Sequence, residues 1–243
     1  MGYREYIREE RFPTSWCGGC GIGIVLKAVC QVFEELGFTD KNTTVVSGIG
    51  CSGRSAGYFN MDTIHGIHGR AVPLAEGAKL ANEKLNVVVF SGDGDLLGIG
   101  GNHLLHACRR NTDITIICID NEIYGMTGGQ KSPTTALDVK TLTSPRGNDE
   151  RPVNIQAIIR AHENFYARST VYHYNHMKKC LKEALQWEGL SFVDMKAACI
   201  SNNGRRLGFK NGYEMLIHYK DQYKIAPKNG GHLLEECELG IIK

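Results

Sequence analysis

The chain has 243 residues, of which 42% are hydrophobic and 22% charged, and its formal net charge is +2. This composition is typical of a globular protein with a sizeable core, and the small net charge argues against a nucleic-acid-binding protein. No apolar run approaches the roughly 20 residues that a membrane helix needs. The charged opening MGYREYIREERFP contains no hydrophobic signal segment. We therefore expect a cytoplasmic protein with no membrane and no nucleic-acid partner.

Helical and strand patterns alternate along the chain. Between Ile22 and Leu36 apolar residues recur every three or four positions, which predicts a helix with one buried face that ends at Gly37. Continuous apolar runs such as NVVVFSG and DITIICID are typical of parallel strands that are covered on both faces. Strands are expected over 43–48, 86–92, 113–120, 164–172 and 191–198, and further helices over 72–84, 97–111, 153–161, 177–185 and 209–224.

This alternation predicts an α/β fold with a doubly wound, mostly parallel sheet. We expect residues 1–243 to form a single domain. The segment 126–152 is rich in Thr, Ser, Pro and Gly, and it is expected to form an irregular loop over the site. The part of the chain from about residue 205 is expected to be a C-terminal extension.

Two acids stand among glycines directly after the strand at 86–92, in the stretch GDGDLLGIGGNH (92–103). The next strand is followed by DNEIYGMTGG, which contains Asn121. A right-handed βαβ crossover brings the ends of both strands to one edge of the sheet, so Asp93 and Asn121 are expected to become neighbours. One carboxylate and one amide oxygen suit Mg²⁺, which completes its shell with phosphate oxygens and water.

The glycine N–H groups and a helix N-terminus would receive the outer phosphate oxygens. The pattern therefore predicts a magnesium–diphosphate cofactor. A solvated turn without a ligand is the alternative interpretation. A Walker A motif is excluded because no GK[ST] follows.

The chain contains nine cysteines, and in a reducing compartment we expect no structural disulfides. Cys17 and Cys20 form a CxxC pair, but zinc would need a second pair or closely spaced histidines, and neither is evident. A [4Fe–4S] cluster can take thiolates from distant segments. Cys51 and Cys199 each follow a predicted strand, so the same edge of the sheet could gather them beside the CxxC pair. Cysteines on apolar faces or strands are expected in the core: Cys30, Cys108, Cys118 and Cys180.

These motifs together resemble a known family. GDG followed by an asparagine turn resembles the diphosphate motif of thiamine-diphosphate enzymes. The longer strings GDGDLLGIGGNHLLHACRRN and NEIYGMTGGQKSPTT are similar to the β subunits of 2-oxoacid:ferredoxin oxidoreductases, and the resemblance covers about residues 12–200. Within that family, IGGNH, CSGR and HGIHGRA are together most similar to the members that act on 2-oxoglutarate.

The resemblance implies a thiamine-diphosphate-binding fold of the diphosphate type, with thiamine diphosphate, Mg²⁺ and a [4Fe–4S] cluster as cofactors. It implies the coenzyme A-dependent oxidative decarboxylation of 2-oxoglutarate to succinyl-CoA, or the reverse carboxylation, with electrons passed to ferredoxin. The α subunit is an implied partner, because no glutamate suited to activating the thiamine is found here and the family takes that acid from α. Gamma and ferredoxin-like delta subunits are further partners of family members.

The resemblance also assigns residues. It implies Asp93, Asn121 and the carbonyl of Ile123 as Mg²⁺ ligands, and Cys17, Cys20, Cys51 and Cys199 as cluster ligands. The usual CPT of the family reads CISNN here, and the usual CPGCG lacks its proline. Asp95 either contacts the cofactor or only fixes the turn. The residues expected around the cofactor are Cys51, Ser52, Gly92, Asp93, Gly94, Asp95, Asn121, Ile123, Tyr124, Gly125, Met126 and Thr127.

The substrate side rests on two residues. Arg54 is the candidate for the distal carboxylate of 2-oxoglutarate, because a guanidinium pairs bidentately with carboxylates, and a surface arginine is the alternative. His68 could bind a substrate carboxylate or shuttle protons. The competing functions are a β subunit for a branched-chain 2-oxoacid (2-oxoisovalerate) or for pyruvate, a ferredoxin-independent thiamine enzyme, and a zinc-stabilised α/β binding module.

Overall fold

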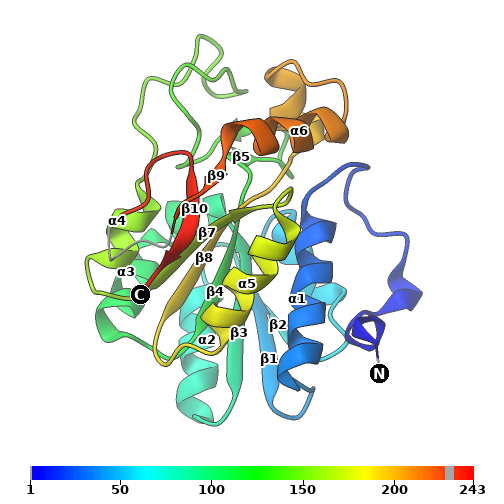
Figure 1. Ribbon diagram of the computed structural model, residues 1–243, viewed down its shortest axis with the longest axis vertical. Coiled ribbons are helices and arrows are strands. Elements are labelled where there is room, and N and C mark those ends of the chain that lie inside the picture. The colour runs from blue at the N-terminus through cyan, green and yellow to red at the C-terminus, as the bar shows by residue number, and fades with distance from the viewer. Residues whose placement is uncertain (1, 228–232) are drawn as a thin grey trace.

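The computed structural model describes residues 2–227 and 233–243. Within them, an eight-stranded sheet has the order β2-β1-β3-β4-β8-β7-β10-β9 (Figure 1). The strands from β2 to β7 pair in parallel, and β10 is antiparallel to β7. The expected mostly parallel α/β sheet is therefore confirmed. Its strands are β1 (Thr43–Ser47), β2 (Asp62–His65), β3 (Asn86–Gly92), β4 (Thr115–Asp120), β7 (Phe165–Thr170), β8 (Ser191–Lys196), β9 (Lys224–Ile225) and β10 (Glu238–Ile242).

Helices cover both faces of the sheet. The buried residues of α1 (Ile22–Leu36) and α5 (Tyr174–Leu185) belong to one apolar cluster. Those of α2 (Ala71–Ala81), α3 (Gly101–Arg110) and α4 (Ile155–Arg160) belong to a second cluster, on the opposite face. Helix α6 (Gly212–Gln222) lies beyond the upper end of the sheet in Figure 1.

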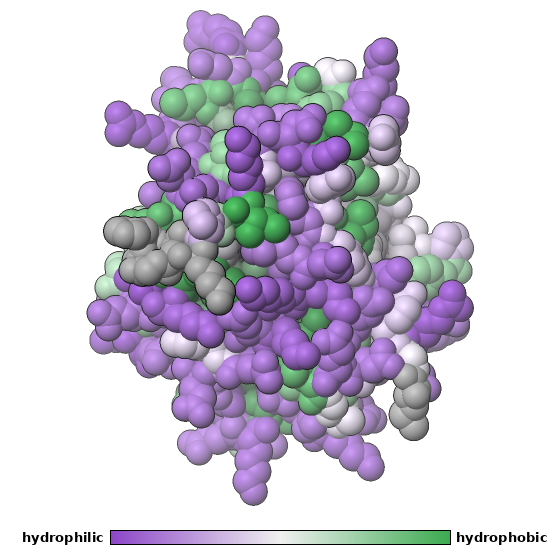
Figure 2. All heavy atoms as spheres, viewed as in Figure 1, coloured by the Kyte–Doolittle hydropathy of each residue, from purple (hydrophilic) through white to green (hydrophobic). Residues whose placement is uncertain are grey.

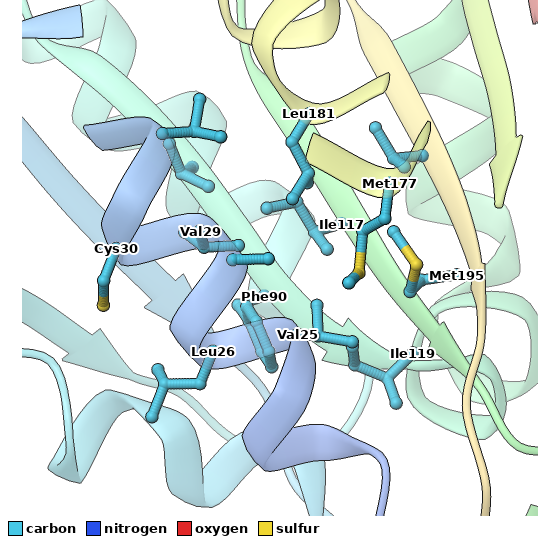
Figure 3. Packing of buried hydrophobic residues seen from close by; sticks show 14 of the residues in the cluster. Val25, Leu26, Val29, Cys30, Phe90, Ile117, Ile119, Met177, Leu181 and Met195 are labelled. Atoms are coloured by element: carbon cyan, nitrogen blue, oxygen red, sulfur yellow. The ribbon is translucent and has the colours of Figure 1, made fainter. Parts of the chain in front are cut away.

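The period of two in the central strands divides the core between these faces. In β3, Val88 and Phe90 point to the cluster of α1 and α5, whereas Val87 and Val89 point to the other cluster. Figure 3 shows Phe90 packed between the α1 side chains, among them Val29, and its strand neighbours. On the outside, hydrophilic residues cover most of the face seen in Figure 2. No helix of the described residues is long and apolar enough to cross a membrane.

Most expected elements are present with shorter bounds, for local reasons. The helix expected to 84 ends at Ala81, because the Asn82 side chain accepts a hydrogen bond from Lys84 N and forms a turn. The helix expected from 97 begins at Gly101, after a π-helical segment, η4 (Gly94–Ile99), in which Gly98 is not helical. Asn154 and Asn211 cap α4 and α6, so these helices begin two and three residues later than expected.

The strand pattern missed some elements. β2 and β9, at the two edges of the sheet, and β10, near the end of the chain, were not expected, and Lys224 of β9 was expected to be helical. The loop expected over 126–152 contains β6 (Gln130–Lys131), which pairs with β5 (Ile123–Tyr124). The remaining strands begin or end within two residues of expectation.

The pairing of β3 with β4 determines where the site lies. Gly92, at the end of β3, is in register with Ile119, near the end of β4. The segments that start with Asp93 and Asn121 therefore leave the sheet side by side, at the carboxyl edge where open α/β sheets bind their ligands.

Candidate functional site

A cavity of about 150 Å³ lies at this edge, between the ends of β1, β3 and β4. Asp93 and Asn121 both line it, as the strand order predicted. Two further residues of the wall, Ile49 and Gly50, were not expected. Every residue expected around the cofactor lines this cavity, together with His68: Cys51, Ser52, Gly92, Asp93, Gly94, Asp95, Asn121, Ile123, Tyr124, Gly125, Met126 and Thr127.

Asp93 is a buried carboxylate without a cationic partner. Its side chain is 2% exposed, and none of its contacts within the described residues is an ion pair. Burial, and then the nearby carboxylate of Asp120, raise the pKa of Asp93 to about 7. A divalent cation at Asp93 would oppose both effects, because its positive charge would compensate the buried negative charge of the carboxylate. The carboxylate therefore fits the expected Mg²⁺ ligand.

Thr134 joins the two acids. Its Oγ1 lies 2.7 Å from Asp93 Oδ2 and 2.8 Å from Asp120 Oδ1. One hydroxyl proton serves only one of these oxygens at a time, so the second contact needs a proton on a carboxyl group. On the far side of Asp120, Lys196 Nζ contacts its carboxylate and lies 3.6 Å from Glu122 Oε1. Thr134 and Lys196 were not identified from the sequence; only the position of SPTT within the expected loop pointed to Thr134.

Asp95 is bonded to the protein on both oxygens. Oδ1 accepts from Ile49 N at 3.0 Å and from Gly69 N at 2.8 Å, and it lies 2.6 Å from His68 Nδ1. Oδ2 accepts from Ser91 Oγ at 2.8 Å. Of the two roles left open for Asp95, these contacts support the fixing of the turn. The contact between His68 Nδ1 and Asp95 Oδ1 holds the imidazole at the wall of the cavity, and Nε2 has no hydrogen-bond partner among the described residues.

Close packing explains a glycine in this motif. A Cβ on Gly94 would lie 2.2 Å from Tyr124 Cε1, so no larger residue fits while the tyrosine ring holds its place. The Tyr124 hydroxyl donates to the Gly94 carbonyl at 3.0 Å. Tyr124 therefore fixes the turn after β3 against the turn after β4.

A second cavity, of about 220 Å³, gathers the four expected cysteines Cys17, Cys20, Cys51 and Cys199. Burial raises the pKa of the Cys20 thiol to about 12, and the other three cysteines add to the increase. Thiols must lose their protons to bind metal, so four neighbouring thiols in a partly buried place fit a cationic iron centre. The four cysteines that were expected in the core are fully buried, as predicted: Cys30, Cys108, Cys118 and Cys180.

The four cysteines line a cavity of about 220 Å³. A structural zinc site needs four ligands that converge on one point. In residues 2–227 and 233–243, no three side chains of His, Cys, Asp or Glu converge in this way.

The two cavities share a wall. Cys51, Asn121, Gly125 and Met126 line both of them. A Cβ on Gly125 would lie 3.3 Å from Cys199 Sγ and 3.8 Å from Cys51 Sγ. Because Gly125 has no side chain, the turn after β4 lies directly against the thiols of Cys51 and Cys199.

Arg54 lines the cysteine cavity but not the cofactor cavity. It is exposed, and it lowers the pKa of Cys51 against the larger effect of burial. Trp16 also lines the cysteine cavity, and its indole N–H donates to the Cys51 carbonyl at 2.7 Å. Arg54 is thus an exposed residue at the edge of the site, beside the four cysteines.

Comparison with known proteins agrees with this geometry. The family described as "Thiamine pyrophosphate enzyme, C-terminal TPP binding domain" matches residues 48–195. The chain is 43% identical to the "2-oxoglutarate synthase subunit KorB" of Archaeoglobus fulgidus, over 99% of this chain and 88% of that protein. It is 42% identical to the "2-oxoacid:ferredoxin oxidoreductase 2, subunit beta" of Aeropyrum pernix, over 86% of this chain and 67% of that protein. The chain belongs to the β subunits of the 2-oxoacid:ferredoxin oxidoreductases.

A solved structure supports this membership. The 2-oxoglutarate:ferredoxin oxidoreductase from Magnetococcus marinus, with 2-oxoglutarate, coenzyme A and succinyl-CoA bound, is similar with a TM-score of 0.89 and 30% identity. The similarity covers all of this chain and 84% of that one. The thiamine-diphosphate-binding α/β fold that was expected from the sequence is therefore confirmed for this chain.

Proposed function

We propose that the chain is the β subunit of a 2-oxoglutarate:ferredoxin oxidoreductase that forms succinyl-CoA or carboxylates it in reverse. The observation that supports this proposal most is the wall shared by the two cavities, because the cavity lined by Asp93 and Asn121 lies directly beside the one lined by four cysteines. An oxidative decarboxylation needs this adjacency, since electrons must leave the cofactor. The bound ligands of the Magnetococcus marinus enzyme support the choice of 2-oxoglutarate and coenzyme A.

The cofactor side would be held by Asp93, Asn121 and the Ile123 carbonyl, which would ligate Mg²⁺. Thiamine diphosphate, when bound, would supply the carbanion that attacks the 2-oxo carbon and the electron sink after loss of CO₂. Backbone N–H groups of Gly92 and Gly94 would receive phosphate oxygens. Asp95 would hold the surrounding segments in place and orient His68, whose free Nε2 would contact the substrate or transfer a proton.

The electron exit would be a [4Fe–4S] cluster bound by Cys17, Cys20, Cys51 and Cys199. Cys51 and the Gly125 backbone lie on both cavities, so they would form the shortest link between cofactor and cluster. Ferredoxin would then take the electrons. All nine cysteines are free, which is consistent with the reducing cytoplasm proposed for this enzyme.

The active site would be completed by the α subunit. No glutamate lines the cofactor cavity among the described residues, so the acid that activates the thiamine would come from that partner. Next to the cavity the side chains of Ile67 and Ile99 are 72% and 55% exposed, and Ile99 contacts Gly69 beside His68. We propose that these two exposed side chains belong to the surface that the α subunit covers. Gamma and ferredoxin-like delta subunits would be further components.

Arg54 would read the distal carboxylate of 2-oxoglutarate from the mouth of the site. The test compares wild type with Arg54→Ala in the complex with α, using viologen reduction with coenzyme A. We expect KM to rise at least tenfold for 2-oxoglutarate and less than twofold for 2-oxobutyrate, which lacks that carboxylate. Equal changes would remove this role for Arg54.

The substrate itself is tested by a panel of 2-oxoacids with the wild-type complex. The proposal expects the highest kcat/KM with 2-oxoglutarate. A higher value with 2-oxoisovalerate or pyruvate would assign the chain to one of the alternative members of the family.

A further inference from the structure

Two consecutive asparagines connect the cysteine cavity to the turn of residues 121–125 after β4, which is called the diphosphate turn below. They lie in the π-helical segment η5 (Ile200–Gly204), directly after Cys199. Asn202 Nδ2 donates to the Gly125 carbonyl at 2.7 Å, and Asn203 Nδ2 donates to the Asn121 carbonyl at 3.0 Å. Both acceptors belong to the turn that lines the cofactor cavity.

The segment that carries these asparagines is itself fixed. Gly204 N donates to the Cys199 carbonyl at 2.8 Å, which closes η5 onto the cysteine. Ile200 packs with Met215 of α6 in a small apolar cluster. Gly21 N, one residue after Cys20, donates to the Ala198 carbonyl at 2.9 Å. A shift of the diphosphate turn would therefore be transmitted to Cys199, and through Ala198 to the CxxC segment.

The two amides have properties suited to this connection. Asn203 is 5% exposed and Asn202 is partly buried, so both bonds are at least partly withdrawn from water. The amides are neutral, and both are engaged with backbone carbonyls through their N–H₂ groups. Removing either side chain would leave a shielded carbonyl of the turn without that donor.

We propose that Asn202 and Asn203 form an amide clamp that couples occupancy of the diphosphate site to retention of the iron–sulfur cluster. Both are positioning residues, and the inference rests on the proposed function. Binding of Mg²⁺ and thiamine diphosphate orders the turn from Asn121 to Gly125, and the clamp transmits this order to the segment of Cys199. By linkage, the bound cluster strengthens the equilibrium binding of the cofactor by the factor by which the cofactor strengthens the binding of the cluster.

The test measures iron release to an anaerobic chelator from the intact complex with α, with and without saturating Mg²⁺ and thiamine diphosphate. For wild type, the cofactor should slow the release about tenfold, in the ordinary range of coupling between sites. In Asn202→Ala and in Asn203→Ala, the slowing should fall below threefold. A wild-type ratio near one, or wild-type ratios in both variants, would overturn the clamp.

Asn154→Ala is the matched control. Asn154 caps α4 away from the cysteine cavity, so its loss should weaken the fold without changing the ratio. A control ratio as low as that of the clamp variants would show a general effect of destabilisation and overturn the proposal.

If a variant retains no iron, its release rate cannot be measured. The affinity of that variant for Mg²⁺ and thiamine diphosphate is measured instead. That affinity should fall severalfold below wild type, and an unchanged affinity would contradict the clamp. A wild-type complex that holds neither iron nor thiamine diphosphate would instead overturn the proposed function. If the complex holds both cofactors and the release ratios of the variants equal that of wild type, only the clamp would be overturned.

Discussion

His68 Nδ1 lies 2.6 Å from Asp95 Oδ1, and this pair connects the loop after β2 to the turn after β3. The same carboxylate accepts bonds from Ile49 N, Gly69 N and Ser91 Oγ. Asp95 thereby ties the segments that follow β1, β2 and β3 to one buried point. The second acid of GDGD shapes the cavity, whereas the first is available to a metal.

Asp95→Asn should unfold more easily than wild type, because an amide group replaces one oxygen that accepts hydrogen bonds in a buried place. We expect the free energy of unfolding to fall by about 2–3 kcal/mol, the usual size for bonds to a charged group. Chemical denaturation measures it, with exposed Asp62→Asn in β2 as the control. A loss no larger than that of the control would contradict the central position of Asp95.

Thr134→Val should weaken the binding of Mg²⁺ and thiamine diphosphate on the order of tenfold, as losses of a group that orients a metal ligand do. The hydroxyl lies between Asp93 and Asp120, and valine keeps the shape but leaves both acids without this partner. Titration calorimetry on the complex measures the affinity. Thr63→Val, in β2 away from the cavity, is the control and should bind as wild type does. Equal affinities in the two variants would show that Thr134 does not orient Asp93.

Gly125→Ala should disturb the iron site, since its Cβ would lie 3.3 Å from Cys199 Sγ. We expect iron content, or the rate of cluster reduction by substrate, to fall at least threefold. Gly77→Ala in α2 is the matched control, because a Cβ there meets nothing within 4 Å and alanine favours a helix. Iron content and reduction rates equal in both variants would contradict the close approach of turn and thiol.

His176, which lies outside the candidate site, makes the stability of the fold depend on pH. Burial lowers its pKa to about 4, and Ser169 Oγ lies 3.0 Å from Nδ1. The unfolded chain takes up a proton below about pH 6.5, but the folded chain does so only near pH 4, so stability is lost as the pH falls through this window.

His176→Gln should reduce this loss by about 1–2 kcal/mol, a figure lowered for the partial exposure of the ring. Denaturation at pH 7 and at pH 4.5 measures the difference. His162→Gln, at an exposed position, should leave the slope unchanged. A slope that is the same in wild type and His176→Gln would contradict a half-buried imidazole that stays neutral in the folded chain.

Local pattern was sufficient to predict the frame of the site. The apolar runs of β3 and β4 end where the glycines and acids begin, and the topology of parallel strands places Asp93 beside Asn121. The positions of Cys51 and Cys199 after strands indicated that they could lie beside Cys17 and Cys20, and the family resemblance implied the same four, which line one cavity. These predictions depend on chain direction and periodicity, which are properties of the sequence.

The missed features depend on tertiary contacts. β2 is an edge strand with half-exposed residues, so it has no continuous apolar run. Thr134 reaches Asp93 across 41 positions of the chain. Asp95 is an acid beside glycines, as Asp93 is, and only its bonds to Ile49, Gly69 and Ser91 distinguish a fixing role from a ligand role. The asparagines after Cys199 gave no sequence signal of their partners in the turn.

The central claim is that this chain, joined to its α subunit, holds a thiamine diphosphate beside a [4Fe–4S] cluster. The most direct measurement is cofactor and metal analysis of the anaerobically purified complex, combined with its visible spectrum before and after 2-oxoglutarate and coenzyme A are added. We expect about four irons and one thiamine diphosphate per chain, and a brown colour that is partly bleached by the substrates. A colourless complex that contains zinc, or no metal and no thiamine diphosphate, would contradict it.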